Sequence, residues 1–571
     1  MLPPFTRRSK PASTRSALGV AIANTFALVM LPETAHAVCG QQSGTYTTTQ
    51  TCTPASGVAA DITTLAGTQV TTTAGNALLV RSTNASSSIL LNSTRVQSTP
   101  PTAVSAVQAQ ILGGVSGPGA ALINFQSGSN LIQSGGSGLD AVAAINTNAG
   151  ASTVLVGAGT EVNINNRAVV TERDGIDVNA SGGGDIVFQH AGTGSILTYG
   201  GNNIWLKGAL GGNVTATVGA GVSLTVDNND PLSGGDPNID DENDPQAGTG
   251  NHAGLHTRAI SGNTTVSNAA TIRGMGLNAF GIFTEGGTGT TNLTNTGSIT
   301  TDGQNGFGIR PISTTGSIHI VNSGDITTTG DNAHAIYVND NIGATGDISI
   351  QNYGDLVVGN ATDPVGSRGI YVIKRGTGNF SLTGSGNITV RNGPDSTRAN
   401  GIIITAAQNG TVDYSGDIVT SGPGASAIRL DSADGDATVN YTGNKLETLS
   451  TQAHGIYVTS LAGKATVSSG GTINTHSEGA GGEGTGIDAY GLRAETGGQD
   501  VSITYTGPRI DVNGTGAAIL ANTTYKSGTG AGGATIDNSG ELVARGNRQR
   551  GIRALTVTAN QTIINRGAIT T

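Results

Sequence analysis

Charged and aromatic side chains are both scarce in this chain. Only 12% of the 571 residues are Lys, Arg, Asp or Glu, and only 4% are Phe, Trp or Tyr. With so few charges, solubility must rest largely on Thr, Ser, Asn and Gly. Gly and Pro together, at 90 and 16 residues, stay below the share typical of a disordered chain. The composition therefore predicts a folded protein with a polar but weakly charged surface.

Several catalytic signatures are absent. No histidine is followed directly by glutamate, which excludes the H-E-x-x-H zinc motif. The chain also has neither a phosphate-binding P-loop nor the nucleophile elbow of serine hydrolases. These absences exclude three common enzyme classes, and the sequence offers no catalytic, cofactor-binding or metal-ligating residue that we would assign.

A long apolar run is also missing, but a short one lies near the N-terminus. Residues 17–30 are apolar, follow Arg7, Arg8, Lys10 and Arg15, and precede an A-x-A site that ends at Ala37. The run is too short to span a membrane permanently, and the layout is typical of a secretory signal. We expect cleavage after Ala37 and ordinary export, because Arg7-Arg8 lacks further twin-arginine context.

Positive charge becomes scarcer once residues 1–37 are removed. They contain four basic residues and one acidic residue, so the formal charge changes from −10 to −13. An acidic chain is a poor candidate for binding nucleic acid or an anionic membrane surface.

Cysteine is limited to Cys39 and Cys52, just behind the predicted cleavage site. In an oxidising compartment two such residues favour a disulfide that closes a small loop. A redox or metal-binding pair is the alternative, but no histidine lies nearby to support it. We expect the disulfide.

The most informative feature is a repeat, of which residues 308–336 are one unit. A small residue followed by an aliphatic one, here called the anchor, recurs about every thirty residues. Three successive steps, Leu255 to Ile282, Ile309 and Ile336, are 27 residues each. Further anchors are Ile370, Ile402, Ile428, Ile456, Leu492, Ile519 and Ile552. A fixed period of this size indicates stacked structural repeats.

The interior of the repeat indicates strands. Ile318, Ile320, Asn322 and Ile326 share one parity, and the residues between them are mostly polar. Alternation of this kind in short runs, separated by Gly, Asn, Asp and Thr, is typical of strands and turns. We predict an all-β chain with about three short strands in each coil of 27–30 residues, stacked as a parallel β-solenoid.

One inward position carries asparagine in several coils. It is occupied by Asn295, Asn322, Asn352, Asn538 and Asn565, and in other coils by Tyr414, Tyr441 and Tyr505. Stacked amides at such a position can hydrogen-bond from coil to coil. We expect an asparagine ladder that is interrupted where tyrosine replaces it.

The domain organisation follows from this repeat. Residues 1–37 form the signal peptide, 38–137 an N-terminal cap and irregular β region with the Cys39–Cys52 loop, and 138–226 the first coils. Residues 227–250 form an acidic insertion, and 251–571 are regular repeats that end within a unit. In the insertion, Asp236, Asn238, Asp240 and Asp244 have part of a calcium-loop spacing. Asp241 replaces its central glycine and Ala247 its terminal glutamate, so a solvated insertion is favoured over a calcium site.

The residue after each anchor forms one outward stripe down the predicted stack. Its candidate binding residues are Arg310, Tyr337, Tyr371, Arg429, Tyr457 and Arg493. Tyr and Arg are frequent in binding hot spots, but a structural ladder of stacked neighbours would have the same composition. The ladder is favoured over an exposed binding stripe. His334 and His454 stand two residues before an anchor, where other coils hold Phe or Arg, so we interpret them as packing residues.

The runs NSGDITTTGDNAHAIYV (322–338), NTGSITTDGQNGFGIRP (295–311) and NYGDLVVGNATDPVGSRGIYV (352–372) resemble passenger domains of bacterial autotransporters, the type V secreted proteins. The resemblance covers the signal peptide and roughly residues 138–571. It implies a right-handed parallel β-helix, exported through the inner membrane and displayed at the outer membrane or released from the cell. It also implies an outer-membrane translocator barrel, in the same chain or a separate one.

Two functions are compatible with this resemblance. The first is a non-enzymatic adhesin that contacts a host or surface glycan or protein. The second is a polysaccharide-degrading β-helix enzyme, either a lyase or a glycoside hydrolase, which needs acidic residues clustered on adjacent coils. The stripe after the regular anchors from residue 283 onward carries no acid, which favours the adhesin. With 4% aromatics the chain holds no aromatic-girdled barrel, so we expect a fragment of a longer product or a separate translocator.

Overall fold

The computed structural model describes residues 36–571 except 57, 74, 99–104, 113–118, 129, 135–139, 165–173, 228–250, 341–342, 360–365, 392–398, 423, 450–452, 477–487, 526–530 and 546–548. The predicted signal sequence up to residue 35 and nearly all of the predicted acidic insertion, including its calcium-loop candidates, lie outside the described residues. The described part contains 53 β-strands and no helix.

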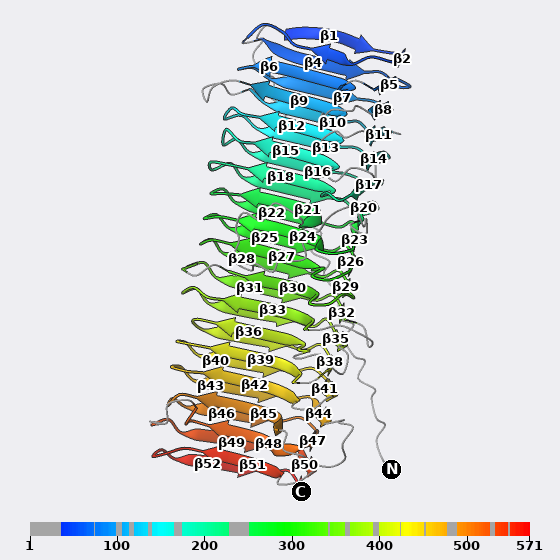
Figure 1. The fold of residues 1–571 in the computed structure, drawn as a ribbon. Helices are drawn as coiled ribbons and strands as arrows, with labels where there is room; N and C mark the ends of the chain where they lie inside the picture. The colour runs from blue at the N-terminus through cyan, green and yellow to red at the C-terminus, as the bar shows by residue number, and fades with distance from the viewer. Residues whose placement is uncertain are drawn as a thin grey trace, which may run out of the picture. The chain divides into compact units, whose positions relative to one another are not determined.

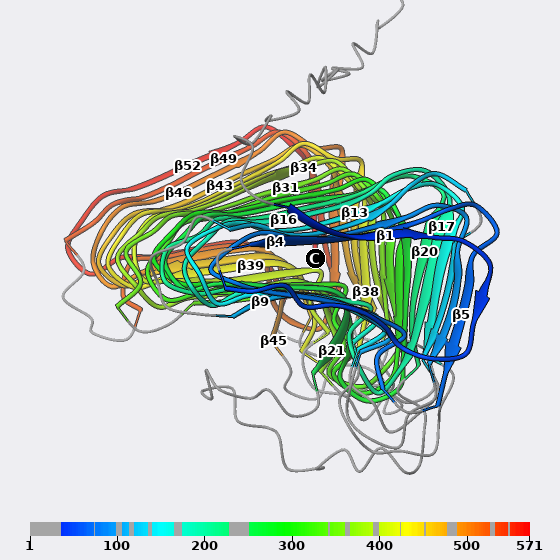
Figure 2. The same ribbon diagram turned by 90° about the horizontal axis from the view of Figure 1, so that it is seen from above.

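Residues 36–571 form a stack of coils in which each coil contributes one strand to each of three sheets, here called A, B and C. The stack is seen from the side in Figure 1 and end-on in Figure 2. Every strand pairs in parallel with the strand three places along the chain, so neighbours in a sheet come from consecutive coils. The predicted all-β parallel β-helix is confirmed.

Sheet A comprises the first strand of each coil, most often five residues long. Its strands are β1 (His36–Gln42), β4 (Ala59–Thr64), β7 (Ser87–Leu91), β10 (Ala121–Phe125), β13 (Ser152–Val156), β16 (Ile186–His190), β19 (Val214–Val218), β22 (Thr264–Asn268), β25 (Thr291–Asn295), β28 (Ile318–Asn322), β31 (Ile348–Asn352), β34 (Phe380–Gly384), β37 (Gly410–Tyr414), β40 (Ala437–Tyr441), β43 (Ala465–Ser469), β46 (Val501–Tyr505), β49 (Ala534–Asn538) and β52 (Gln561–Asn565).

Sheet B comprises the second strands, several of which have only two to four residues. Its strands are β2 (Thr45–Tyr46), β5 (Gln69–Thr72), β8 (Arg95–Ser98), β11 (Leu131–Ser134), β14 (Thr160–Ile164), β17 (Gly194–Tyr199), β20 (Val222–Asp227), β23 (Thr271–Met275), β26 (Ile299–Asp302), β29 (Ile326–Thr328), β32 (Leu356–Val358), β35 (Ile388–Arg391), β38 (Ile418–Ser421), β41 (Lys445–Leu449), β44 (Thr472–His476), β47 (Arg509–Asn513), β50 (Glu541–Arg545) and β53 (Ile569–Thr570).

Sheet C comprises the third strands, which carry the anchors. Its strands are β3 (Gln50–Cys52), β6 (Leu78–Thr83), β9 (Val107–Leu112), β12 (Val142–Asn146), β15 (Ile176–Ala180), β18 (Ile204–Gly208), β21 (His252–Ala259), β24 (Ala279–Gly286), β27 (Ile309–Ser313), β30 (His334–Asn339), β33 (Arg368–Lys374), β36 (Ile402–Ala406), β39 (Ser426–Ser432), β42 (His454–Ser460), β45 (Asp488–Thr496), β48 (Thr515–Asn522) and β51 (Arg550–Leu555).

The core is a continuous column of aliphatic side chains inside the coils. Ile309, Ile318, Ile320 and Ile326 are all at most 1% exposed, as their shared parity predicts. One cluster of buried apolar side chains runs from Cys52 to Leu542. Because each coil is stabilised by the coils above and below it, the core grows with the stack instead of forming a globular centre.

The small residue before the anchor is required by close packing inside the coil. A Cβ on Gly308 would lie 2.4 Å from Cγ2 of Ile326 and 2.6 Å from the carbonyl oxygen of Ala335. Because both neighbours lie so close, only Gly, or Ala with a small shift, fits beside the inward isoleucine. The small residue followed by an aliphatic one therefore recurs because each coil is tightly packed at this position.

The asparagine ladder forms as predicted. Asn268 donates a hydrogen bond from Nδ2 to Oδ1 of Asn295 (2.7 Å), and the contact repeats to Asn322 and then Asn352, each at 2.8 Å. The ladder stops at Gly384, because the Tyr414 ring of the next coil fills the space where another side chain would be. Asn352 instead donates to the Tyr414 hydroxyl at 3.0 Å.

Residues 38–137, whose register could not be fixed from the sequence, contribute strands to the same three sheets. Ile62, Ile89 and Ile123 occupy equivalent inward positions in sheet A, and Leu78 is paired with Val107 in sheet C. The sequence period is blurred because turn lengths vary: paired anchors of sheet C stand 26 residues apart at Ile402 and Ile428, but 36 at Ile456 and Leu492.

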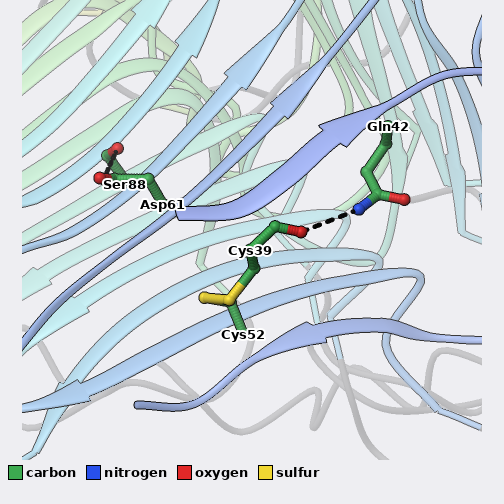
Figure 3. The surroundings of a disulfide bond; sticks show 5 residues. All are labelled: Cys39, Gln42, Cys52, Asp61 and Ser88. Carbon is green, nitrogen blue, oxygen red and sulfur yellow. Dashed lines mark hydrogen bonds between the residues drawn. A yellow bond between two sulfur atoms is a disulfide. The ribbon is translucent and has the colours of Figure 1, made fainter. Parts of the chain in front are cut away.

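Cys39 on β1 and Cys52 at the end of β3 form a disulfide, with their Cα atoms 5.6 Å apart. Figure 3 shows the bond beside Gln42, whose side-chain amide donates to the carbonyl oxygen of Cys39 at 3.3 Å. The bond ties the first strand of sheet A to the first strand of sheet C. It therefore closes the terminal coil.

Loss of this disulfide is expected to loosen the first coil. A loop of this size stabilises the folded state by about 3 kcal/mol on the chain-entropy model. A Cys39→Ser/Cys52→Ser variant should exchange its amide hydrogens faster in β1 to β6, with little change beyond β12. Two alkylated cysteines in the unreduced wild-type protein would contradict the bond.

Candidate functional site

The outward face of sheet C holds every candidate residue of the predicted stripe. Strand pairing places Phe283 beside Arg310, Tyr337 beside Tyr371, and Arg429 beside Tyr457, one coil apart in each case. The row continues through Arg493, Leu520 and Arg553. Toward the N-terminus it also includes Asp177, Trp205 and His256, which the sequence analysis did not assign to it.

The stripe faces outward, but its central tyrosines are buried, which contradicts the alternative of an exposed binding stripe at these positions. Tyr337 is 4% exposed and Tyr457 is 7% exposed, while Tyr371 and the arginines are half-buried. The cause is a second outward column, two residues before each anchor, which packs its rings against the stripe. Phe307, for example, lies 5.1 Å from Tyr337 between ring centroids.

One packed cluster surrounds Arg310. Its guanidinium carbon lies 5.2 to 5.6 Å from the ring centroids of Phe280, Phe283, Phe307 and Tyr337. Tyr337 in turn stacks on Tyr371 with centroids 5.1 Å apart. Cation–π contacts and ring stacking of this kind stabilise neighbouring coils. The faces of these rings are therefore already occupied within the protein.

His334 belongs to the same cluster. It is 2% exposed, stacks on Phe307 at 5.2 Å and meets Tyr371 edge-on at 5.2 Å. Burial, reinforced by the nearby positive charges of Arg368 and Arg310, holds the pKa of His334 well below its usual value. A neutral ring packed among aromatic side chains fits the interpretation of this column as packing.

A second cluster surrounds Glu495, which is 2% exposed. Its carboxylate accepts hydrogen bonds from the Tyr457 hydroxyl, from Arg493 Nη2 and from Asn522 Nδ2, each at 3.0 Å. Arg429 is held separately by Asp431 at 2.7 Å. The polar ends of three stripe residues are thus bonded to the protein itself.

A group of carboxylates lies at the N-terminal end of the same face. Asp140 and Asp174 occupy equivalent places on consecutive coils, and Asp140 accepts the backbone N–H of Asp174 at 3.1 Å. Asp177 pairs with Lys207 at 3.3 Å. Asp177 follows the anchor Ile176, so the stripe rule applied to earlier coils would have found it. Asp140 could be placed only once strand pairing had fixed the register.

These carboxyl groups shift one another's protonation. Burial, followed by the charge of Asp177, raises the pKa of Asp174 to about 7. Burial also raises the pKa of Asp140 well above its usual range. The positive charge of Lys207 lowers the pKa values of Asp140 and Asp174, but it offsets only part of the rise. Beside them, Trp205 stacks on His256 at 3.5 Å, and Nε2 of His256 lies 2.7 Å from the Glu285 carboxylate.

Outward side chains on sheet A form a different surface. From β31 to β52 one position per strand carries a hydroxyl group, and strand pairing aligns these positions coil by coil. The row consists of Ser349, Ser381, Thr411, Thr438, Thr466, Ser502, Thr535 and Thr562, and is called the hydroxyl row below. All eight are at least partly exposed, and none bonds its hydroxyl to another described residue.

A hollow of about 380 Å³ lies on the hydroxyl row. Thr466, Ser502 and Thr535 line it together with Lys464 and Asp500. Among the described residues no group of three or more His, Cys, Asp or Glu side chains is placed to hold a metal ion. The same residues include no helix long and apolar enough to cross a membrane.

Comparison with known proteins finds no matching family model, no similar curated protein and no similar solved structure.

Proposed function

We propose that this chain is an exported β-helix of the autotransporter-passenger kind and acts as a non-enzymatic interaction rod. The hydroxyl row carries the proposal, because it presents in register along one face eight hydroxyl groups that bond to no other residue in the described part of the chain. A repeated surface allows weak contacts to add along an extended partner. A glycan or protein at a host or other surface is the expected partner.

The hydroxyl row suits contact better than the stripe on sheet C. Hydroxyl groups without an internal partner can donate to and accept from a ligand, whereas the rings and charges of the stripe are bonded within the protein. Tyr337, Tyr371, Arg429 and Tyr457 are therefore proposed mainly as a ladder that stabilises the rod.

Two matched variants separate these roles. Replacing Thr411, Thr438, Thr466 and Thr535 with valine keeps shape and strand preference but removes four hydroxyl groups. We expect this variant to keep its melting temperature and to lose at least tenfold in binding across a glycan and extracellular-matrix panel.

The second variant replaces Tyr337, Tyr371, Arg429 and Tyr457 with alanine. We expect it to lose several kcal/mol of stability, because buried rings are removed from two packed clusters. If only this alanine variant loses binding while remaining folded, the stripe is the contact surface.

Export is the second part of the proposal. Cleavage after Ala37 would leave Val38 as the first residue and remove two residues from β1, which starts at His36. N-terminal sequencing of the secreted protein tests this cleavage. An outer-membrane barrel, encoded in the same reading frame or separately, is the expected translocator.

A polysaccharide-degrading enzyme is the second candidate, favoured by the clustering of Asp140, Asp174 and Asp177. One observation speaks against an enzyme. The contact in which Asp140 accepts a backbone N–H from the next coil also occurs far from this cluster, where Asp325, just before β29, accepts the N–H of Asp355 at 3.0 Å. Turnover of polygalacturonate and related glycans by the wild-type protein, abolished by Asp177→Asn, would replace the rod with the enzyme. We expect no turnover.

A further inference from the structure

Lys374 and Asp340 form an ion pair inside the β-helix. The ammonium nitrogen of Lys374 lies 2.7 Å from Oδ2 of Asp340, and the two side chains are 0% and 3% exposed. Asn339 and Ile373 are paired between β30 and β33, so the next residues, Asp340 and Lys374, follow at equivalent places on consecutive coils. In neighbouring coils the place is held by Ser313 and Ala406, which carry no charge.

Such a pair is costly as two separate ions. Removing an ammonium and a carboxylate from water carries a large desolvation cost for each ion, and their attraction offsets it only with near-ideal geometry. A neutral product that joins the two side chains would avoid the cost of burying charge.

We propose that Lys374 and Asp340 join covalently through an amide bond between Nζ and Cγ, which links two consecutive coils. A proton passes from the Lys374 ammonium to Oδ2 of Asp340, and the free amine then attacks Cγ. As the intermediate collapses, the Cγ–Oδ2 bond breaks, a second proton leaves Nζ for that oxygen, and one water molecule departs. Nothing is oxidised or reduced, and no co-reactant is needed.

The surrounding groups favour each stage. The carbonyl oxygen of Ala344 accepts a hydrogen bond from Nζ at 3.2 Å, which orients the amine. The backbone N–H of Arg375 donates to Oδ1 of Asp340 at 2.5 Å, where the intermediate carries its negative charge. Contact between nucleophile and carboxyl group replaces a bimolecular encounter with an intramolecular step. Burial keeps out the water that would reverse the reaction.

The mass of the intact protein tests the proposal directly. The wild-type chain, after its N-terminus has been determined, should weigh less than the corresponding sequence by one water molecule beyond the two hydrogens lost to the disulfide. Trypsin should then release a branched peptide in which residues 369–375 remain attached to the segment that contains Asp340. The full sequence mass, with residues 340 and 374 in separate peptides, would overturn the cross-link and leave only an ion pair.

Two controls make the result specific. Lys374→Arg keeps the positive charge but cannot form this amide, so it should restore the missing water. If the water loss persists in that variant, it arises elsewhere and the proposal fails.

Lys207 and Asp177 provide an internal comparison, because they are 3.3 Å apart on the outer face, with Lys207 34% exposed. They should stay unlinked, and a branched peptide there but not at Lys374 would also overturn the proposal.

Discussion

Acidification from pH 7 to pH 4 is expected to unfold the coils that bury histidine. Burial lowers the pKa of His252 to about 4 and that of His454 to about 3, and it lowers the pKa of His334 in the same direction. The unfolded chain then binds protons below pH 6.5 that the folded chain does not. Stability is therefore complete above pH 6.5 and is lost as the pH falls toward 4.

The expected loss of stability on acidification is large because each buried histidine contributes to it separately. A fall in pKa from 6.5 to about 4 corresponds to about 3 kcal/mol for one histidine. His454 lies near Arg429 and Arg493, and His334 lies near Arg368 and Arg310. Protonation of either histidine is therefore opposed by burial and also by the positive charges of these arginines. Hydrogen exchange at pH 5 should show β30 to β45 opening first.

Phenylalanine at these two positions should remove most of the effect. Phe280 and Phe307 already occupy the same column in other coils, so His334→Phe and His454→Phe preserve the packing. The double variant should unfold at a lower pH than the wild type. His319→Gln, a change at an exposed site on sheet A, is the control and should leave the acid transition in place. Equal acid midpoints for all three proteins would refute this explanation.

Aspartates near the N-terminus respond in the opposite direction. The pKa of Asp174 is raised to about 7, so the folded chain holds a proton that the unfolded chain releases between about pH 4 and pH 7. This contribution strengthens the fold as the pH falls. His190 in β16, whose pKa is lowered to about 4 by burial, acts against it in the same coils. The net acid response should be smaller there than in β30 to β45.

Among single substitutions on the outward face of sheet C, removal of the Glu495 carboxylate is expected to cause the largest loss of stability. Glu495→Ala leaves the Arg493 guanidinium, 18% exposed, without its ion-pair partner, and the Tyr457 hydroxyl and Asn522 amide without their acceptor. Breaking one side of a buried ion pair costs about 3–5 kcal/mol. Denaturant unfolding, followed by hydrogen exchange in β42, β45 and β48, measures the loss.

Glu447→Ala is the matched control. Glu447 pairs with Lys445 at 2.7 Å, but the lysine is 41% exposed and the glutamate 20% exposed. Exposed pairs contribute about 1 kcal/mol or less. A similar loss in the two variants would show that the stability of the cluster does not depend on its buried carboxylate.

The sequence alone determined the repeat, the inward face and the ladder. Ile318, Ile320 and Ile326 could be assigned to the core because alternation along a strand has a fixed period of two. Asn295, Asn322 and Asn352 could be aligned because the turn after them is short and nearly constant. Local geometry sets all of these features, so neighbouring residues in the chain carry the signal.

Only the tertiary structure decided which outward residues are free and which coils face one another. Tyr337 and Tyr457 are buried because a second column of side chains packs beside them: Phe307 of the neighbouring coil and His334 of the same coil contact Tyr337, and His454 of the same coil contacts Tyr457. Asp340 meets Lys374, and Asp140 meets Asp174, at separations of 34 residues that depend on the lengths of the turns between them. Because turn lengths vary from coil to coil, strand pairing fixes these contacts, and no fixed period in the sequence could.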